Sequence, residues 1–124
     1  MAEVHDYLDE IVGATLSAIT FVSDYYQFQF NGPMFNVLTP VTVDSESGRA
    51  ITGDDQFRNL VCGQIGRIVR KVTVREGEAI VIRFQDESEV RFSLNESDYP
   101  GPEAVIFFGG SIFGGSGSRA WGVF

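Results

Sequence analysis

The segment RIVRKVTVREGEAIVIRFQDESEVRFSL, residues 67–94, alternates apolar and polar side chains over three short runs. The runs 67–74, 78–84 and 89–94 are joined at REGE and QDES, whose glycine and polar residues are typical of tight turns. Alternation with a period of two is the pattern of a strand with one face in the core and one in solvent. The segment therefore predicts a three-stranded antiparallel meander with its apolar face turned inward.

The same pattern occurs earlier in the chain, which indicates a duplicated unit. At one constant offset, Val4, Leu8, Val12, Gly13, Leu16, Ile19 and Phe21 match Phe57, Val61, Ile65, Gly66, Val69, Val72 and Val74. With a one-residue gap, Tyr26, Phe28 and Phe30 match Ile80, Ile82 and Phe84, and a further gap brings Val37 onto Phe92. We predict a single domain over 1–124, with repeat 1 at about 3–43, repeat 2 at about 54–95 and a C-terminal extension at 96–124.

Each repeat begins with apolar residues spaced by four, as on one face of a helix. These residues are Val4, Leu8 and Val12 in the first copy and Phe57, Val61 and Ile65 in the second. The segment TGDDQF (52–57) supplies capping residues and early acidic charge before the second helix. Gly13 and Gly66 stand where each helix should end, at a position that favours a left-handed backbone.

The last third of the chain departs from the repeat. NESDYPGPEA (95–104) is a turn-rich connector, and VIFF (105–108) predicts a strand that is covered on both faces or lies at a sheet edge. GGSIFGGSGS (109–118) is a glycine-rich loop, and RAWGVF (119–124) can return as a final strand. The predicted fold class is α+β and β-rich. Two helix-plus-three-strand meander repeats form a bent sheet or barrel-like layer, with a C-terminal hairpin.

Aromatic residues crowd the stretch DYYQFQF (24–30), which could form a ligand-binding surface or a core strand. Tyr26, Phe28 and Phe30 match apolar strand positions of the second repeat, so we interpret them as core residues. The opposite face of this strand carries two glutamines and Tyr25, the one aromatic residue there that solvent could reach.

The charge of the chain is acidic and uneven. The formal net charge is −8, and residues 1–48 contain no Lys or Arg. Because nucleic acids and anionic membranes are bound mainly through cations, the sequence argues against both partners and favours a basic protein. No apolar run approaches the roughly 20 residues of a membrane helix, the acidic start is unlike a signal peptide, and the single cysteine excludes a disulfide framework. A cytoplasmic, bacterial-type protein is predicted.

No set of residues predicts catalysis, a metal or a cofactor, so we expect a protein that is not an enzyme. His5 has no positioned partner, and Cys62 at a helix end is expected to be a buried small hydrophobe. The glycine-rich loop lacks the lysine of a phosphate-binding P-loop. Glu96, Asp98 and Glu103 share one connector, where turn formation is more common than a paired-acid or calcium site.

The cations of the second repeat alternate with acidic residues. Arg67, Arg70, Lys71, Arg75, Arg83 and Arg91 are interspersed with Glu76, Glu78, Asp86, Glu87 and Glu89. This pattern predicts cross-strand ion pairs on a solvated sheet face. A nucleic-acid surface would also need interleaved aromatic residues, which this segment lacks.

The stretches FSLNESDYPGPEAVIFF (92–108) and IGRIVRKVTV (65–74) together resemble a family of small, uncharacterised bacterial proteins. That family has a duplicated sheet unit and an SL…DY.GPEA signature near the C-terminus. Residues 57–108 carry the resemblance, the first copy carries it more weakly, and the glycine-rich tail departs from it. Such small, acidic proteins are similar to immunity proteins, which neutralise a cognate toxin. The resemblance implies a binding function without catalytic residues.

Three functions agree with these features. The first, which we favour, is a non-catalytic protein-binding module, most concretely an immunity-type inhibitor of a basic toxin or enzyme. Its candidate contacts lie in predicted turns and strand ends: Asp24, Tyr25, Asp44, Glu46, Asp98, Tyr99 and Glu103. The second is a small-ligand-binding or enzymatic β-barrel-like protein. The third is a structural homo-oligomer, such as a homodimer formed through VIFF or a sheet edge.

Overall fold

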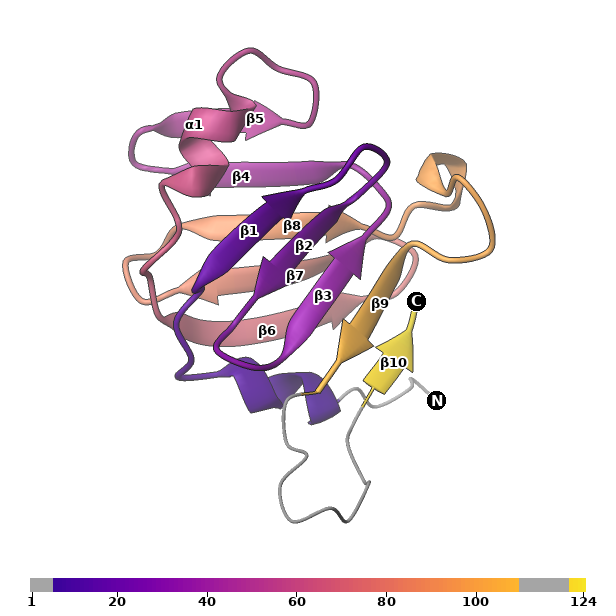
Figure 1. Ribbon diagram of the computed structural model, residues 1–124, viewed down its shortest axis with the longest axis horizontal. Helices are drawn as coiled ribbons and strands as arrows, with labels where there is room; N and C mark the ends of the chain where they lie inside the picture. Colours follow the sequence, from indigo (N-terminus) through magenta and orange to yellow (C-terminus); the bar gives the residue numbers. More distant parts are fainter. Residues whose placement is uncertain (1–5, 110–120) are drawn as a thin grey trace.

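The computed structural model describes residues 6–109 and 121–124, and over these residues two five-stranded antiparallel sheets lie face to face (Figure 1). The first sheet has the strand order β1-β2-β3-β9-β10. Its strands are β1 (Ala18–Phe21), β2 (Tyr26–Gln29), β3 (Met34–Val37), β9 (Val105–Phe108) and β10 (Trp121–Val123). The second sheet has the order β5-β4-β8-β7-β6. Its strands are β4 (Val41–Ser45), β5 (Gly48–Ile51), β6 (Val69–Arg75), β7 (Ala79–Phe84) and β8 (Glu89–Ser93).

The antiparallel meander predicted over residues 67–94 is present as β6-β7-β8. Its apolar side chains point between the sheets, as the alternation predicts: Ile80, Ile82 and Phe84 are fully buried. A second meander, β1-β2-β3, occupies the first sheet. Phe28 and Phe30 are each 1% exposed, so their interpretation as core residues is confirmed.

The helices of the described residues are short: η1 (Asp6–Ile11), α1 (Phe57–Cys62) and η2 (Glu96–Asp98), of which η1 and η2 are 3-10 helices. The predicted spacing of four is wrong at its last position, because Val12 and Ile65 are 45% and 41% exposed. Ile11 and Gln64 are buried instead. A 3-10 helix has three residues per turn, which puts Ile11 on the same face as the buried Leu8. The helix α1 ends before residue 65, so Ile65 cannot continue its face.

The segment 52–57 does not cap α1 as predicted. The N-cap position is Gln56, which makes no side-chain capping bond. Asp54 Oδ2 instead accepts a hydrogen bond from Ile51 N at 2.9 Å, and Thr52 Oγ1 accepts one from Val41 N at 2.9 Å. These bonds fasten the end of β5. Short polar side chains commonly accept hydrogen bonds from nearby backbone N–H groups in turns. Here Thr52 and Asp54 do so and therefore do not cap α1.

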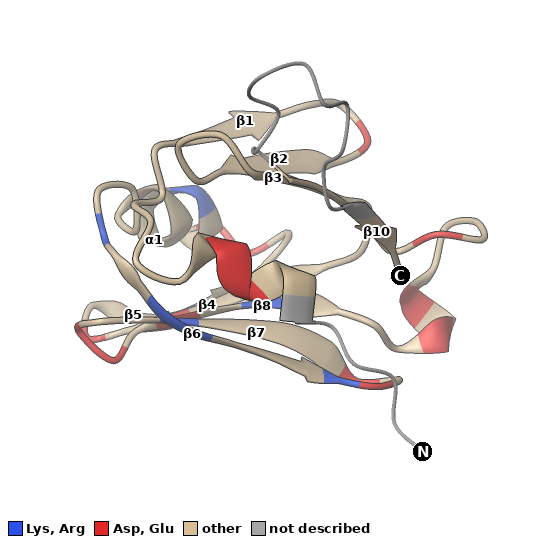
Figure 2. Ribbon diagram, turned by 90° about the horizontal axis from the view of Figure 1, so that it is seen from below, with Lys and Arg blue, Asp and Glu red and all other residues tan. Residues whose placement is uncertain are grey.

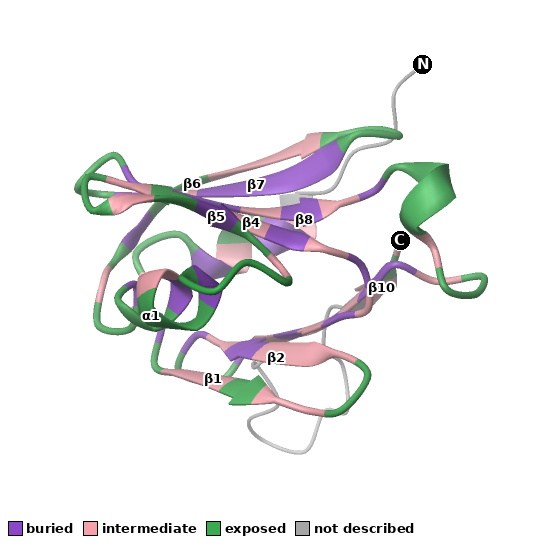
Figure 3. Ribbon diagram, turned by 90° about the horizontal axis from the view of Figure 1, so that it is seen from above, coloured by how far each residue is buried: buried purple, intermediate pink, exposed green. Residues whose placement is uncertain are grey.

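Aromatic rings fill the space between the two sheets. Phe92 of the second sheet lies 4.9 Å from Phe28 and 5.3 Å from Phe35, measured between ring centroids, and Phe35 lies 4.8 Å from Phe107. Figure 3 shows the buried residues concentrated on the strands and the exposed residues on the turns. The predicted barrel-like layer is wrong: across the described residues the strands form two separate layers with a filled interior.

Each meander is extended by a hairpin from the other half of the chain. The hairpin β4-β5 follows β3 in sequence but pairs with β8, and the hairpin β9-β10 follows β8 but pairs with β3. VIFF is therefore an inner strand with one buried face, neither covered on both faces nor at an edge. Sequence periodicity reports which face of a strand is buried, but it does not report which distant strand will pair with it.

The pairings in the two sheets correspond to each other. Tyr26 pairs with Val37 as Ile80 pairs with Phe92, and Phe28 pairs with Phe35 as Ile82 pairs with Val90. The correspondence continues into the exchanged hairpins. Val37 pairs with Val105 as Phe92 pairs with Val41. The pairing pattern therefore continues past the predicted end of each repeat.

The outer face of the second sheet carries the predicted cross-strand ion pairs, which are confirmed. Arg67 pairs with Asp86, and Arg70 pairs with Glu87. The side chain of Glu89 is only 11% exposed, and its carboxylate contacts two arginines, Arg83 on β7 and Arg91 on β8. Burial raises the pKa of Glu89, but the hydrogen bond and charge of Arg83, with the charge of Arg91, outweigh it and leave that pKa below its ordinary value.

The outer face of the first sheet has a different character, because its five strands contain no charged residue. On this face Ile106 and Phe108 are half-buried, and Val123 is 45% exposed. The charged residues of the described chain thus lie on the second sheet, the helices and the turns. None of the helices in the described part of the chain is long and apolar enough to cross a membrane.

Candidate functional site

Carboxylates gather at one end of the two-sheet structure, which we call the acidic end. Three segments lie at this end: the β1–β2 turn (22–25), the β6–β7 turn (76–78) and the connector 94–104 that contains η2 (Figure 1). Their acidic residues are Asp24, Glu76, Glu78, Glu96, Asp98 and Glu103. Figure 2 shows these acidic positions on the same side of the molecule. The nearest cation in sequence, Arg75, lies 3.9 Å from Glu78.

The structure divides the seven predicted contact residues between two ends of the molecule. Asp24, Tyr25, Asp98, Tyr99 and Glu103 lie at the acidic end. Asp44 and Glu46 lie beside the β4–β5 turn at the opposite end, where Asp44 pairs with Arg49 in the strand register. The predicted residues therefore do not form one surface, and the larger group belongs to the acidic end.

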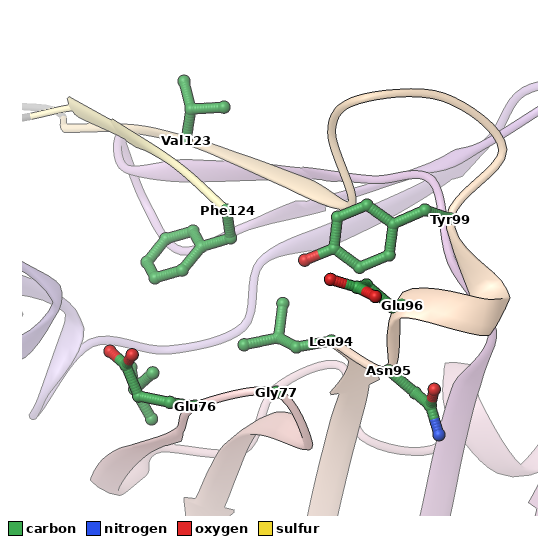
Figure 4. Close-up of a pocket in the computed structure, with 9 residues that line it drawn as sticks. Glu76, Gly77, Leu94, Asn95, Glu96, Tyr99, Val123 and Phe124 are labelled. Atoms are coloured by element: carbon green, nitrogen blue, oxygen red, sulfur yellow. The ribbon is translucent and has the colours of Figure 1, made fainter.

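The main cleft of the acidic end has a volume of about 530 Å³ and lies between the sheets. Its lining comes from three separate segments: Val74, Glu76, Gly77, Leu94, Asn95, Glu96, Tyr99, Val123 and Phe124. Figure 4 shows the Tyr99 ring and the Glu96 carboxylate on one side, Phe124 across from them and Leu94 below. Glu76 rises from the β6–β7 turn on the opposite wall. The cleft combines an apolar floor with two carboxylates.

Local hydrogen bonds hold the wall formed by η2. Asn95 Oδ1 accepts a bond from Ser97 N at 3.1 Å and so caps this 3-10 turn. Asp98 Oδ2 accepts a bond from Ser93 Oγ at 2.6 Å, which ties the far side of the turn to β8. Within the described residues, the Glu96 carboxylate has no ion-pair partner. The Glu96 carboxylate therefore faces the cleft, whereas the Asp98 carboxylate stabilises the turn.

The opposite wall depends on Gly77. Its φ of +71° is a conformation that favours glycine, and the turn closes through a hydrogen bond from Glu78 N to Arg75 O at 2.9 Å. This tight turn places Glu76 at the tip of the β6-β7 hairpin beside the cleft. The floor is fixed by Leu94, which is 5% exposed, and its backbone N–H donates to Glu78 O at 2.9 Å.

A second, smaller cleft of about 270 Å³ lies at the corresponding place in the first half of the chain. The β1–β2 turn supplies Asp24 and Tyr25, and Thr39 and Thr52 stand where Leu94 and Phe124 stand in the main cleft. Both threonines are committed to structural bonds: Thr39 Oγ1 donates to Ser93 O at 2.6 Å. This second cleft has an acid and an aromatic ring but lacks the apolar floor.

Other residues considered for chemistry do not join either cleft. Cys62 is exposed, not buried as predicted, because α1 turns its neighbours Phe57 and Val61 inward. His5 and most of the glycine-rich loop lie outside the described residues. Among the residues that are described, no group of three or more His, Cys, Asp or Glu side chains is arranged to hold a metal ion.

Sequence reasoning missed Glu76, Glu96, Leu94 and Phe124 as residues of one site. The acidic turn REGE and the acidic connector are both visible in the sequence, and each could have been flagged as a strand-end carboxylate. Their proximity was not visible, because it depends on β10 pairing with β9, which in turn pairs with β3 of the other half of the chain. No family model, no curated protein and no solved structure matches this chain.

Proposed function

We propose that the protein is a non-catalytic protein-binding module that binds a basic partner through the acidic end. The observation that supports this is that three segments at one end supply six carboxylates and no Lys or Arg, with Arg75 next to the β6–β7 turn. In its most concrete form the hypothesis is an immunity-type inhibitor of a basic toxin or enzyme. The module works by binding alone and needs no cofactor.

Physical chemistry favours a partner of opposite charge at such a surface. Complementary charge accelerates encounter and disfavours wrong partners, while affinity comes mainly from a few anchors in desolvated pockets. The acidic end offers both parts: exposed carboxylates such as Asp24 and Asp98, and the main cleft with Leu94 in its floor. Because salt screens exposed charges, we also expect this binding to weaken as the salt concentration rises.

The test is capture of partners from a lysate of the organism that encodes the chain. Three baits are compared: the wild type, Asp24→Lys/Glu103→Lys at the acidic end, and Asp44→Lys/Glu46→Lys at the opposite end. The two variants change the net charge equally, so bulk electrostatics is controlled. We expect a stoichiometric basic protein that binds the wild type and the opposite-end variant and is lost from the acidic-end variant. Equal capture by all three baits would refute a role for the acidic end.

A homodimer is the second candidate, and one observation favours it. The outer face of the first sheet presents Ile106, Phe108 and Val123 without a charged neighbour on any strand. Light scattering at micromolar concentration decides this, with Val123→Lys as the variant that should dissociate a dimer built on this face. A small-ligand or enzymatic function is the remaining alternative, and it would have to use the clefts at the sheet ends, since aromatic rings occupy the interior.

We also propose that the chain arose by duplication of a helix, a three-stranded meander and a hairpin. The matching strand registers support this, since Phe28–Phe35 corresponds to Ile82–Val90 and Val37–Val105 corresponds to Phe92–Val41. Under this proposal each unit donates its hairpin to the other unit's sheet. The two clefts are then equivalent sites that have diverged.

A further inference from the structure

From the geometry of the main cleft we infer that it receives an arginine side chain of the protein partner. This inference rests on the proposed function and adds the chemical identity of the group that is anchored. A long side chain that is apolar along its stem and cationic at its tip fits a cleft that has an apolar floor and carboxylates on its walls. The volume of about 530 Å³ falls within the range of sites that enclose small organic groups.

The floor is suited to the stem of such a side chain. Leu94 is buried, and Val74 and Phe124 are partly buried, so all three present apolar atoms to the cleft. Arginine and lysine both bury their methylene groups along apolar surface while the charged head stays near water. Burying the stem on this floor would add affinity that an exposed acidic surface cannot supply.

The walls are suited to a guanidinium. Glu76 and Glu96 come from different turns and flank the cleft, and none of its lining residues is a cation. The planar guanidinium donates in several directions and can therefore engage carboxylates on two walls, whereas an ammonium group is a point charge. The Tyr99 ring borders the same space and offers a face on which a guanidinium can stack.

The second cleft provides a comparison within the same molecule. Asp24 and Tyr25 supply a carboxylate and an aromatic ring there, but Thr39 and Thr52 replace the apolar floor and the volume is about half as large. If charge alone governed binding, both clefts would bind arginine. If the floor is required, binding should be confined to the main cleft.

The experiment is an NMR titration of the isotope-labelled full chain with two short peptides. One peptide is acetyl-Gly-Gly-Arg-Gly-Gly-amide, and the other carries citrulline, which has nearly the same shape but no charge, in place of arginine. We expect the arginine peptide to bind with a dissociation constant of about a millimolar, as suits a single anchor. It should shift the amide signals of Gly77, Leu94 and Phe124, and the citrulline peptide should bind about tenfold more weakly or less.

A matched pair of variants locates the effect. Glu76→Gln/Glu96→Gln should weaken the arginine peptide by about tenfold, and Asp24→Asn/Glu103→Gln, which removes the same charge at the same end, should change it less than about twofold. All four residues are in turns or connectors, so we expect both variants to keep the fold. The NMR spectra of the variants test this directly. Equal binding of the citrulline peptide, or equal loss in both variants, would overturn the inference. The inference would also be overturned if agmatine, a small molecule with a guanidinium and an amine, bound more than about tenfold more tightly than the peptide. The natural ligand would then be a small amine and not a side chain of a protein.

The outcome is separable from that of the lysate experiment, because the titration needs no partner and the charge-reversal variants leave Glu76 and Glu96 intact. Loss of capture with the acidic-end variant but no peptide binding would leave the proposed function standing without the arginine anchor. Peptide binding in the main cleft with capture unchanged would refute the role of the wider acidic end.

Discussion

Thr15 and Ile68 form an isolated antiparallel bridge at equivalent positions of the two halves of the chain, since adding 53 to the first number gives the second. The hydrogen bonds around the bridge form two matched pairs. Gly13 N donates to Val69 O and Gly66 N donates to Leu16 O, each at 2.8 Å; Leu16 N donates to Arg67 O and Val69 N donates to Ala14 O, each at 2.9 Å. The same offset of 53 exchanges the members of each pair.

This relationship has the form of a local two-fold axis, because exchanging the halves reproduces the same bonds. Gly13 and Gly66 allow the backbone to turn into this paired arrangement. Their φ angles are +89° and +98°, in the left-handed region that was predicted for them. The bridge lies just before the starts of β1 and β6, at the end of the sheets opposite the acidic end (Figure 1). The bridge thus joins the two segments that lead into the corresponding meanders.

We expect the two halves of the chain to fold together when expressed as separate polypeptides. Cutting between Gly53 and Asp54, in an exposed turn, gives fragments that each lack two strands of their own sheet, because β4-β5 pairs with β8 and β9-β10 pairs with β3. Neither fragment alone should show the dispersed NMR spectrum of a β fold, and an equimolar mixture should regain it. A fragment that folds as a monomer by itself would contradict the exchange of hairpins.

Phe92→Ala should be strongly destabilising, because its ring joins the two sheets through Phe28 and Phe35. Removing a fully buried phenylalanine costs about 3–5 kcal/mol in the free energy of unfolding. Denaturant titration measures the loss. The control is Phe108→Ala on the half-buried outer face, which should cost clearly less. Equal losses would mean that the ring cluster is not the centre of the core.

Gly122→Ala should destabilise the C-terminal strand although glycine is usually the weaker strand residue. A Cβ atom at position 122 would lie 2.6 Å from Tyr7 Cζ and 2.7 Å from Cε2, closer than packed atoms allow. Tyr7 is itself held against Phe107, with ring centroids 5.9 Å apart, so it cannot move freely. The expected loss is about 1–3 kcal/mol in thermal or denaturant unfolding. Gly101→Ala, with no atom within 4 Å of the added carbon, should change stability little.

Glu89→Gln should lower stability at neutral pH by about 1–3 kcal/mol, because it removes the charge that the contacts with Arg83 and Arg91 stabilise. The folded-state pKa of Glu89 is lowered, so its contribution is fully present above the unfolded value of about 4.3 and is lost as the pH falls through the folded pKa. The gap in unfolding free energy between wild type and variant should therefore be constant near neutral pH and shrink in acid.

The control for that series is Glu87→Gln, whose side chain is 61% exposed. Its ion pairs with Arg70 and Arg83 are solvent-screened, so the expected change is at most about 1 kcal/mol. A gap between wild type and Glu89→Gln that stays the same down to strongly acidic pH would show that the charge of Glu89 contributes nothing to stability.

The strands of the second sheet were predictable because their signal is local. Alternation along 67–94 identified β6, β7 and β8 and the inward faces that carry Ile80 and Ile82. The helices were predicted less well, since a spacing of four named Val12 and Ile65 where the structure buries Ile11 and Gln64. Helices of six residues contain too few turns for periodicity to define a face reliably, and here tertiary packing chose it.

The candidate site was predictable only in its parts. Tyr99 and the acidic connector were named from composition, as were Asp24 and Tyr25 in the first turn. Only the fold separates these residues from Asp44 and Glu46. The same fold brings Glu76 and Glu96 to one cleft with Leu94 and Phe124. Both results follow because each hairpin pairs with a strand of the other half of the chain. Such contacts join residues far apart in sequence, and no local pattern encodes them.

What the sequence by itself determined is the alternation of its strands, the glycines that end its helices and the sign of its charge. Each of these is a property of a residue and its near neighbours. Tertiary structure alone decided that the strands form two facing layers, and that six carboxylates collect at one end around an apolar-floored cleft. The physical reason is that burial of the aromatic core selects one pairing of distant strands, and this pairing places the turns.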